Sequence, residues 1–233
     1  MDAFKVNINS LFVFAVSFTI LIYLIPPNGL LNGDEEMYFK AASNNILNSF
    51  NFNSAFILNE NTLNHRFLYD FICGRLVNYF GYELTHVYGR LFIVFLFSLS
   101  LTSLLEYFKA SIVEVAFVLL SFLILHQNYY SGLQLFKGFL ASDFSYSISL
   151  FSIVYMFKRK YLVALILLVL ATYFHFLIGG YSFLFFIIYY YFNSDKKVFS
   201  LFYVFLYLIL ISPLLFFLIK SNFSYDSSAL DYD

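Results

Sequence analysis

The sequence predicts an all-α membrane protein with about seven transmembrane helices and two juxtamembrane interfacial helices in a long first outer loop. Three observations lead to this prediction. Of the 233 residues, 61% are hydrophobic and only 12% are charged, and the mean hydropathy is +0.79. Apolar runs of roughly 15 to 20 residues recur, close to the length that crosses a hydrocarbon core of about 30 Å. Lysine and arginine gather in alternate connections between these runs, as in multi-pass proteins.

The first apolar run and the long run near residue 180 need separate arguments. The first ends at Pro26-Pro27, a strong helix terminator, and no small-residue cleavage site follows, so we expect a retained signal-anchor helix. The run from 161 to 192 is too long for one crossing and holds Gly179-Gly180 near its middle, so we divide it at a turn over 175–180. One transmembrane module then fills 1–233, with spans at about 11–25, 87–105, 112–125, 138–157, 161–176, 180–192 and 198–219.

The charge pattern predicts an orientation. With a cytoplasmic N-terminus, the inner connections hold most of the positive charge of the short loops, namely Lys5, Lys109, Lys158, Arg159, Lys160, Lys196 and Lys197. The loop 28–86, the turn 175–180 and the acidic C-terminal tail then lie on the periplasmic or luminal face. We therefore expect an integral protein of a plasma or inner membrane whose active face is the outer one.

The long outer loop contains two predicted interfacial helices joined by an Asn-rich connector. The first covers about 34–49, where acids in the first turn suit the positive end of the helix dipole. The second covers about 66–80, where apolar residues recur at a spacing of four and are interrupted by Arg66, Asp70 and Arg75. Neither stretch is apolar enough to span a membrane.

The acidic triplet Asp34-Glu35-Glu36 follows the first span within this apolar chain. Clustered carboxylates beside a bilayer are costly to desolvate, which favours a chemical role for them. A solvated helix N-terminus, with acids placed there for the dipole and for topology, explains the same residues without chemistry. Both interpretations stay open at this point.

One motif in this segment resembles a known family. The pattern Asp34-Glu35-x-x-Tyr38-x-x-x-Ala42 is similar to the Asp-Glu-x-x-Tyr-x-x-x-Ala pattern in the first outer loop of GT-C integral-membrane glycosyltransferases. That class includes protein O-mannosyltransferases and the aminoarabinose transferases of lipid A. The predicted architecture also resembles their N-terminal seven-helix module. Such enzymes usually continue further, so we expect a fragment, a truncated gene or a reduced relative.

The resemblance implies an inverting transfer of a sugar from a polyprenyl-phosphate carrier to an acceptor on the outer face. Asp34 would be the general base, and Glu35 would orient Asp34 or the acceptor. Membrane lipid and the lipid-linked sugar donor would be the partners. The phosphate would need cations, and Arg66, Arg75 and Arg90 are the outer-side arginines, with Arg90 the first choice because of its depth. As an alternative, Arg66 and Arg75 are snorkelling interface anchors.

Two further residues are candidates for substrate binding, beside Tyr38 of the motif. Asp143 stands near Lys137 in the short polar break 141–143, where it is either functional or part of a helix cap or local ion pair. His175 stands in the predicted turn 175–180, where it contacts a phosphate or a metal, or only caps a helix. The other histidines, among them His65 and His86, are scattered without metal-ligand spacing, so we predict no metal site, although a divalent cation stays open as a cofactor.

Several classes of function are excluded or disfavoured. A net charge of −1 without a basic stripe gives no sign of nucleic-acid binding. Phosphate-binding Gly-rich loops, a nucleophile elbow and Cys or His clusters are absent from the sequence. The alternatives to a glycosyltransferase are a membrane transporter or polysaccharide-handling protein, and a non-catalytic membrane assembly partner. The sequence does not indicate an oligomeric state.

Overall fold

The computed structural model describes residues 65–124 and 138–226, together with positions 12, 15–17, 19–20, 35, 38–40 and 42. Within these residues the regular structure is entirely helical, so the all-α fold class is confirmed. The helices are α3 (Phe67–Tyr107), α4 (Ile112–Ile124), α5 (Ala141–Phe157), α6 (Tyr161–Phe174), α7 (Phe176–Asn193) and α8 (Phe199–Asp226).

Three of the described helices are long and apolar enough to cross a membrane. They are α3, α7 and the stretch Phe199–Phe216 of α8, whereas α6 is apolar but shorter. Membrane association is therefore supported by length and composition. The predicted first span, 11–25, lies largely outside the described residues. The count of about seven crossings and the orientation of the chain stay predictions.

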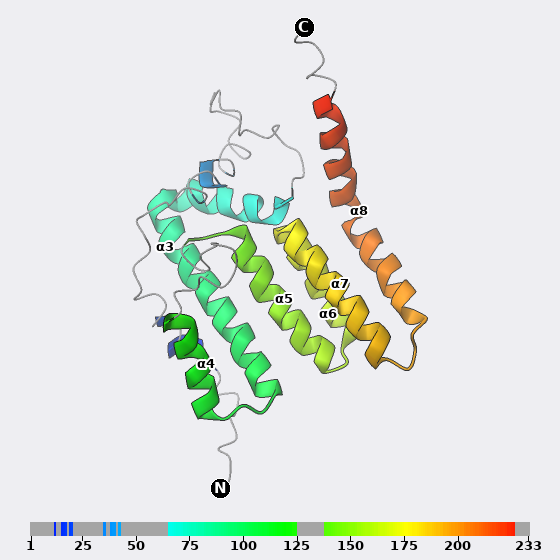
Figure 1. Ribbon diagram of the computed structural model, residues 1–233. Coiled ribbons are helices and arrows are strands. Elements are labelled where there is room, and N and C mark those ends of the chain that lie inside the picture. The colour runs from blue at the N-terminus through cyan, green and yellow to red at the C-terminus, as the bar shows by residue number, and fades with distance from the viewer. Residues whose placement is uncertain are drawn as a thin grey trace.

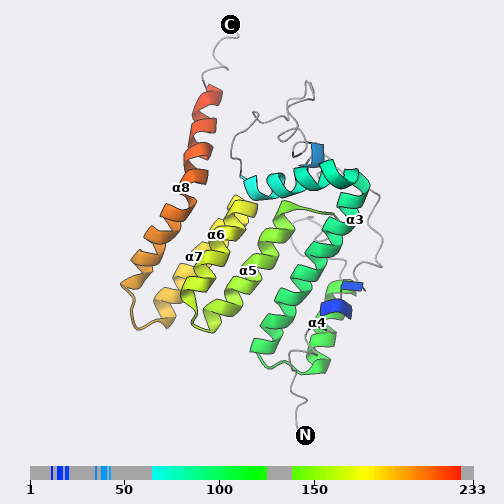
Figure 2. The same cartoon turned by 180° about the vertical axis from the view of Figure 1, so that it is seen from behind.

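Helix α3 consists of two helical limbs that meet at a kink, in the region where two separate helices were expected. Its 41 residues bend at Gly81, whose φ of 74° and ψ of 175° are not helical and suit glycine. The limb before Gly81 runs across the ends of α5, α6 and α7, and the limb after it runs alongside α5 (Figures 1 and 2). The predicted interfacial helix 66–80 therefore joins the predicted span 87–105 through a bend. The position of the first limb relative to a membrane stays a prediction.

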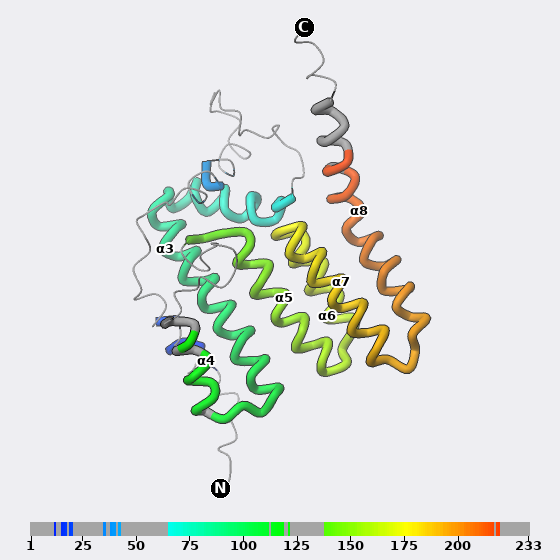
Figure 3. Tube along the Cα trace, viewed as in Figure 1, coloured from blue at the N-terminus to red at the C-terminus, as the bar shows by residue number. Residues whose placement is uncertain are grey.

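Helix α5 lies at the centre of the bundle and packs against α3, α6 and α7, while α8 packs against α6 and α7 (Figure 3). Small hydroxyl side chains connect α5 to α6. The hydroxyl of Ser145 donates to the carbonyl oxygen of Ala171 at 2.9 Å, and that of Ser152 donates to Ala164 at 3.0 Å. Small polar residues of this kind allow apolar helices to approach closely.

The junction of α6 and α7 differs from the predicted turn. The helices are separated by His175 alone, which is extended, and Gly179 and Gly180 lie inside α7. Gly179 serves close packing instead of a turn, because a Cβ there would lie 2.3 Å from the backbone nitrogen of Thr172. The hydroxyl groups of Thr172 and Tyr207 lie 2.7 Å apart and connect the same part of α6 to α8.

Candidate functional site

Buried ionisable side chains gather at the end of the bundle that the first limb of α3 crosses and where α5 begins. Burial of charge in an apolar protein is unfavourable unless the groups are paired, so such residues mark a structural or functional site. Each is 8% exposed or less, and we call them the polar cluster: Glu35, Arg66, Asp70, His86, Arg90 and Asp143.

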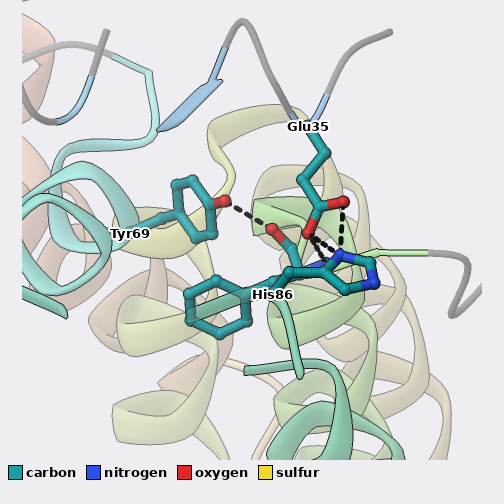
Figure 4. A network of polar contacts seen from close by, with 4 residues as sticks. Glu35, Tyr69 and His86 are labelled. Carbon is teal, nitrogen blue, oxygen red and sulfur yellow. Dashed lines mark hydrogen bonds and ion pairs between the residues drawn. The ribbon is translucent and has the colours of Figure 1, made fainter. Parts of the chain in front are cut away.

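The centre of the polar cluster is the contact between Glu35 and His86 (Figure 4). Nδ1 of His86 lies 2.8 Å from Oε1 and 2.7 Å from Oε2 of Glu35. The backbone N–H of Phe139 donates to Oε1 at 2.7 Å. An ionised carboxylate only accepts hydrogen bonds, so it pairs here with the His86 tautomer that has its hydrogen on Nδ1. The buried carboxylate of Glu35 thus contacts both the second limb of α3 and the residues that lead into α5.

Tight packing holds the residues before α5 in this position. A Cβ on Gly138 would lie 2.7 Å from Oε2 of Glu35, and a Cβ on Gly89 would lie 2.4 Å from the ring of Phe139. The hydroxyl of Tyr69 donates to the carbonyl oxygen of Phe139. Both backbone polar groups of Phe139 are therefore used, the N–H by Glu35 and the carbonyl by Tyr69 of the first limb of α3.

Arg90 and Asp143 lie on facing helices at the same level of the bundle. Arg90 stands one helical turn after His86 on the same face of α3. Gly89 packs against Phe139, and the rings of Phe92 and Phe144 lie 5.9 Å apart, so this part of α3 faces the first turn of α5. Asp143 belongs to that turn and is 1% exposed. The predicted polar break 141–143 is therefore the start of α5.

The other two predicted arginines have different environments. Nε of Arg66 lies 3.0 Å from Oδ1 and 3.3 Å from Oδ2 of Asp70, and its guanidinium lies 3.8 Å from the centre of the Tyr38 ring. Arg75 is exposed and lies 4.0 Å over the ring of Phe71. The structure thus brings Arg66 and Tyr38 to the polar cluster and leaves Arg75 outside it.

His175 contacts a second histidine away from Glu35. Its ring lies 6.3 Å from that of His65, and the N–H of Phe176 donates to the carbonyl oxygen of His65 at 2.9 Å. Nδ1 of His175 is buried without a hydrogen-bond partner among the described residues. Burial, His65 and the charge of Arg66 lower the pKa of His175 to about 4, and burial and Arg66 lower the pKa of His65. Both rings are therefore neutral at pH 7.

Acidification is expected to weaken the contact between His65 and His175. The pKa of His175 is about 4 in the folded protein and near 6.5 when it is unfolded, so the unfolded chain binds the proton first as the pH falls. The stability present above pH 6.5 is then lost between pH 6.5 and 4. Thermal unfolding in detergent from pH 7 to pH 5 should show a steeper fall of Tm in the native protein than in His175→Gln. Parallel curves would contradict this interpretation.

The chemistry available to the polar cluster is proton transfer and anion binding. Carboxylates and imidazole exchange protons near neutral pH, and a buried guanidinium binds phosphate oxygens. Among the residues that the structure describes, no group of three or more His, Cys, Asp or Glu side chains could hold a metal ion. Asp34 and Glu36 lie outside the described residues, as does Lys137.

The sequence interpretation did not identify His86 and Asp70 as members of this site. His86 was grouped with the isolated histidines, and Asp70 only interrupted an apolar pattern. One signal was available, because His86 and Arg90 are four residues apart and so share a face of an apolar helix.

Comparisons with protein-family models, curated proteins and solved structures found no match to this chain.

Proposed function

We propose that this chain is an integral-membrane glycosyltransferase of the GT-C kind. It moves a sugar from a polyprenyl-phosphate carrier to an acceptor hydroxyl, with inversion, at the periplasmic or luminal face. The observation that supports this most is the gathering of buried ionisable residues around Glu35, the neighbour of Asp34 in the motif. Buried charge at one end of an apolar helix bundle is unfavourable for stability alone, which favours a functional role.

The proposed reaction uses Asp34 as the general base. Asp34 takes the proton of the acceptor hydroxyl, and the acceptor oxygen forms a bond to the anomeric carbon. The bond from that carbon to the phosphate oxygen breaks, and polyprenyl phosphate leaves with the bonding electrons. An inverting transfer needs this single displacement and one base.

The contacts of the polar cluster favour separate roles for Glu35 and Arg90. Both oxygens of Glu35 are occupied by His86, and Oε1 also by Phe139, which favours an orienting role over proton transfer. Arg66 is neutralised by Asp70. Arg90 is 4% exposed and one turn from His86, so it is the arginine we propose for the phosphate of the donor.

The direct test is Asp34→Asn in proteoliposomes. The donors are polyprenyl-phosphate mannose and polyprenyl-phosphate aminoarabinose, the acceptor is an envelope extract, and release of polyprenyl phosphate is measured. We expect Asp34→Asn to lower the rate by about 10²- to 10⁴-fold, because it removes the base.

The matched control is Glu36→Gln, which removes a neighbouring acid that has no counterpart in the motif. This variant should retain transfer, and both variants should insert and unfold like the native protein. Undiminished transfer by Asp34→Asn would overturn the proposal.

A further inference from the structure

We infer that His86 is a positioning residue that acts through Glu35 to hold the acidic segment, of which the structure describes residues 35, 38–40 and 42, against the helix bundle. The inference about the segment rests on the contacts of the described residues. Its consequence for catalysis rests on the proposed function, because Asp34 is covalently adjacent to Glu35.

Among the described residues, the Glu35 carboxylate has two donors, one in α3 and one just before α5. His86 and Glu35 are each 2% exposed. Nδ1 of His86 lies within hydrogen-bond distance of both carboxylate oxygens of Glu35. The second donor is the N–H of Phe139. A carboxylate buried to this degree needs such donors, since an unpaired charge would be strongly unfavourable. Loss of the imidazole therefore favours movement of Glu35 toward water, together with the segment that carries it.

The two donors are fixed by contacts that do not involve the acidic segment. His86 lies in the second limb of α3, five residues after the bend at Gly81. The carbonyl of Phe139 accepts from Tyr69, and its ring lies 5.4 Å from that of Phe144. The receiving side is thus held by contacts among α3, α5 and the residues before α5, as a positioning site requires.

An apolar contact one helical turn later completes the attachment. Phe39 is fully buried, and its ring lies 6.1 Å from the rings of both Phe139 and Tyr82. Glu35 and Phe39 are four residues apart, so they share a helix face. Ala42 in the same segment is also 0% exposed. The described part of the segment therefore contacts the bundle through Glu35, through Tyr38 under the guanidinium of Arg66, and through Phe39. Of these three contacts, that of Glu35 depends on His86.

The test uses a single reporter cysteine at Ala42. The chain has one cysteine, the buried Cys73, so Cys73→Ala gives a background in which Ala42→Cys is the only thiol. Modification by a membrane-permeant maleimide should be slow when His86 is present. His86→Ala should raise the rate about 10- to 100-fold, the factor expected for loss of a charge-assisted hydrogen bond in a buried site. His86→Gln keeps a side-chain N–H donor and should restore most of the protection.

Two controls separate release of the segment from general unfolding. Tyr88→Ala changes an exposed residue of the same helix, 58% exposed, and should leave the labelling rate unchanged. A cysteine at Ala164 in α6, which is 0% exposed, should stay protected in every variant. Two results would overturn the inference, provided that position 164 stays protected. One is fast labelling at position 42 when His86 is present. The other is an equal labelling rate with and without His86.

The catalytic arm distinguishes this inference from the proposed function. His86→Ala should lower kcat by about 100-fold with little change in the KM of the lipid donor, because a misplaced base affects the transition state more than donor binding. Normal labelling and normal kcat in His86→Ala, with an inactive Asp34→Asn, would overturn the positioning role alone. If His86→Ala raises the labelling rate as expected but Asp34→Asn leaves transfer undiminished, the proposed function alone is overturned.

Discussion

Replacing Asp70 with leucine is expected to reduce the free energy of unfolding by about 3–5 kcal/mol, because it leaves the charge of Arg66 buried without the carboxylate of Asp70. Both partners are almost fully buried, at 8% and 4% exposed, and the nearest nitrogen and oxygen are 3.0 Å apart. Chemical unfolding in mixed detergent micelles, followed by circular dichroism, measures the change. A loss below about 1 kcal/mol would mean that the pair behaves as an exposed ion pair.

Two companion variants test the cause of that loss. Arg75→Leu removes an exposed arginine from the same limb of α3, where the guanidinium stacks on Phe71, so it should cost less than about 1 kcal/mol. The double variant Arg66→Met with Asp70→Leu removes both buried charges and should recover much of the stability lost by Asp70→Leu. Additive losses in the double variant would contradict this explanation.

Gly179→Ala is expected to have the second largest effect on stability. The new methyl group would lie 2.3 Å from the nitrogen and 2.4 Å from the Cα of Thr172, and backbone atoms of a packed helix cannot move aside easily. Helices α6 and α7 would have to separate, so we expect a loss at the upper end of the range of about 1–3 kcal/mol that is typical of overpacking. The same unfolding measurement tests it.

The adjacent glycine provides the matched control. Gly180 also lies inside α7, but nothing lies within 4 Å of the position its Cβ would occupy. Gly180→Ala should therefore stabilise α7 by up to about 1 kcal/mol through its higher helix propensity. Equal effects at positions 179 and 180 would show that helix propensity, and not the contact with Thr172, decides the outcome.

The local parts of the fold could be predicted from the sequence. Apolar runs predicted the helical class, and the charged breaks at 158–160 and 194–197 placed the end of α5, the start of α6, the end of α7 and the start of α8 within a few residues. The hydropathy of a segment indicates its length and whether it is buried, and it depends only on the residues of that segment. The glycine pair was interpreted as a turn because sequence does not distinguish a glycine that bends the chain from one that admits a neighbouring helix. The two limbs of α3 were predicted as separate helices, and the non-helical backbone at Gly81 does divide them.

The partners within the site could be predicted much less well. Glu35 was identified from its motif, but its contact with His86 joins residues 51 positions apart, and its contact with Phe139 joins residues 104 positions apart. Such pairs depend on how α3 and α5 pack, and no periodic pattern in either segment records them. The role of Asp34 as the base stays a prediction.

The wide sequence separation of the partners of Glu35 also has a consequence for biosynthesis. The ribosome adds Phe139 only after 104 further residues, and at about 5–20 residues per second this takes roughly 5–20 s. Throughout that interval the nascent chain carries a carboxylate whose second donor has not yet been synthesised. Completion of the site is therefore timed by translation of the residues before α5, and premature termination upstream of them would leave Glu35 without the N–H of Phe139 however well α3 had already inserted.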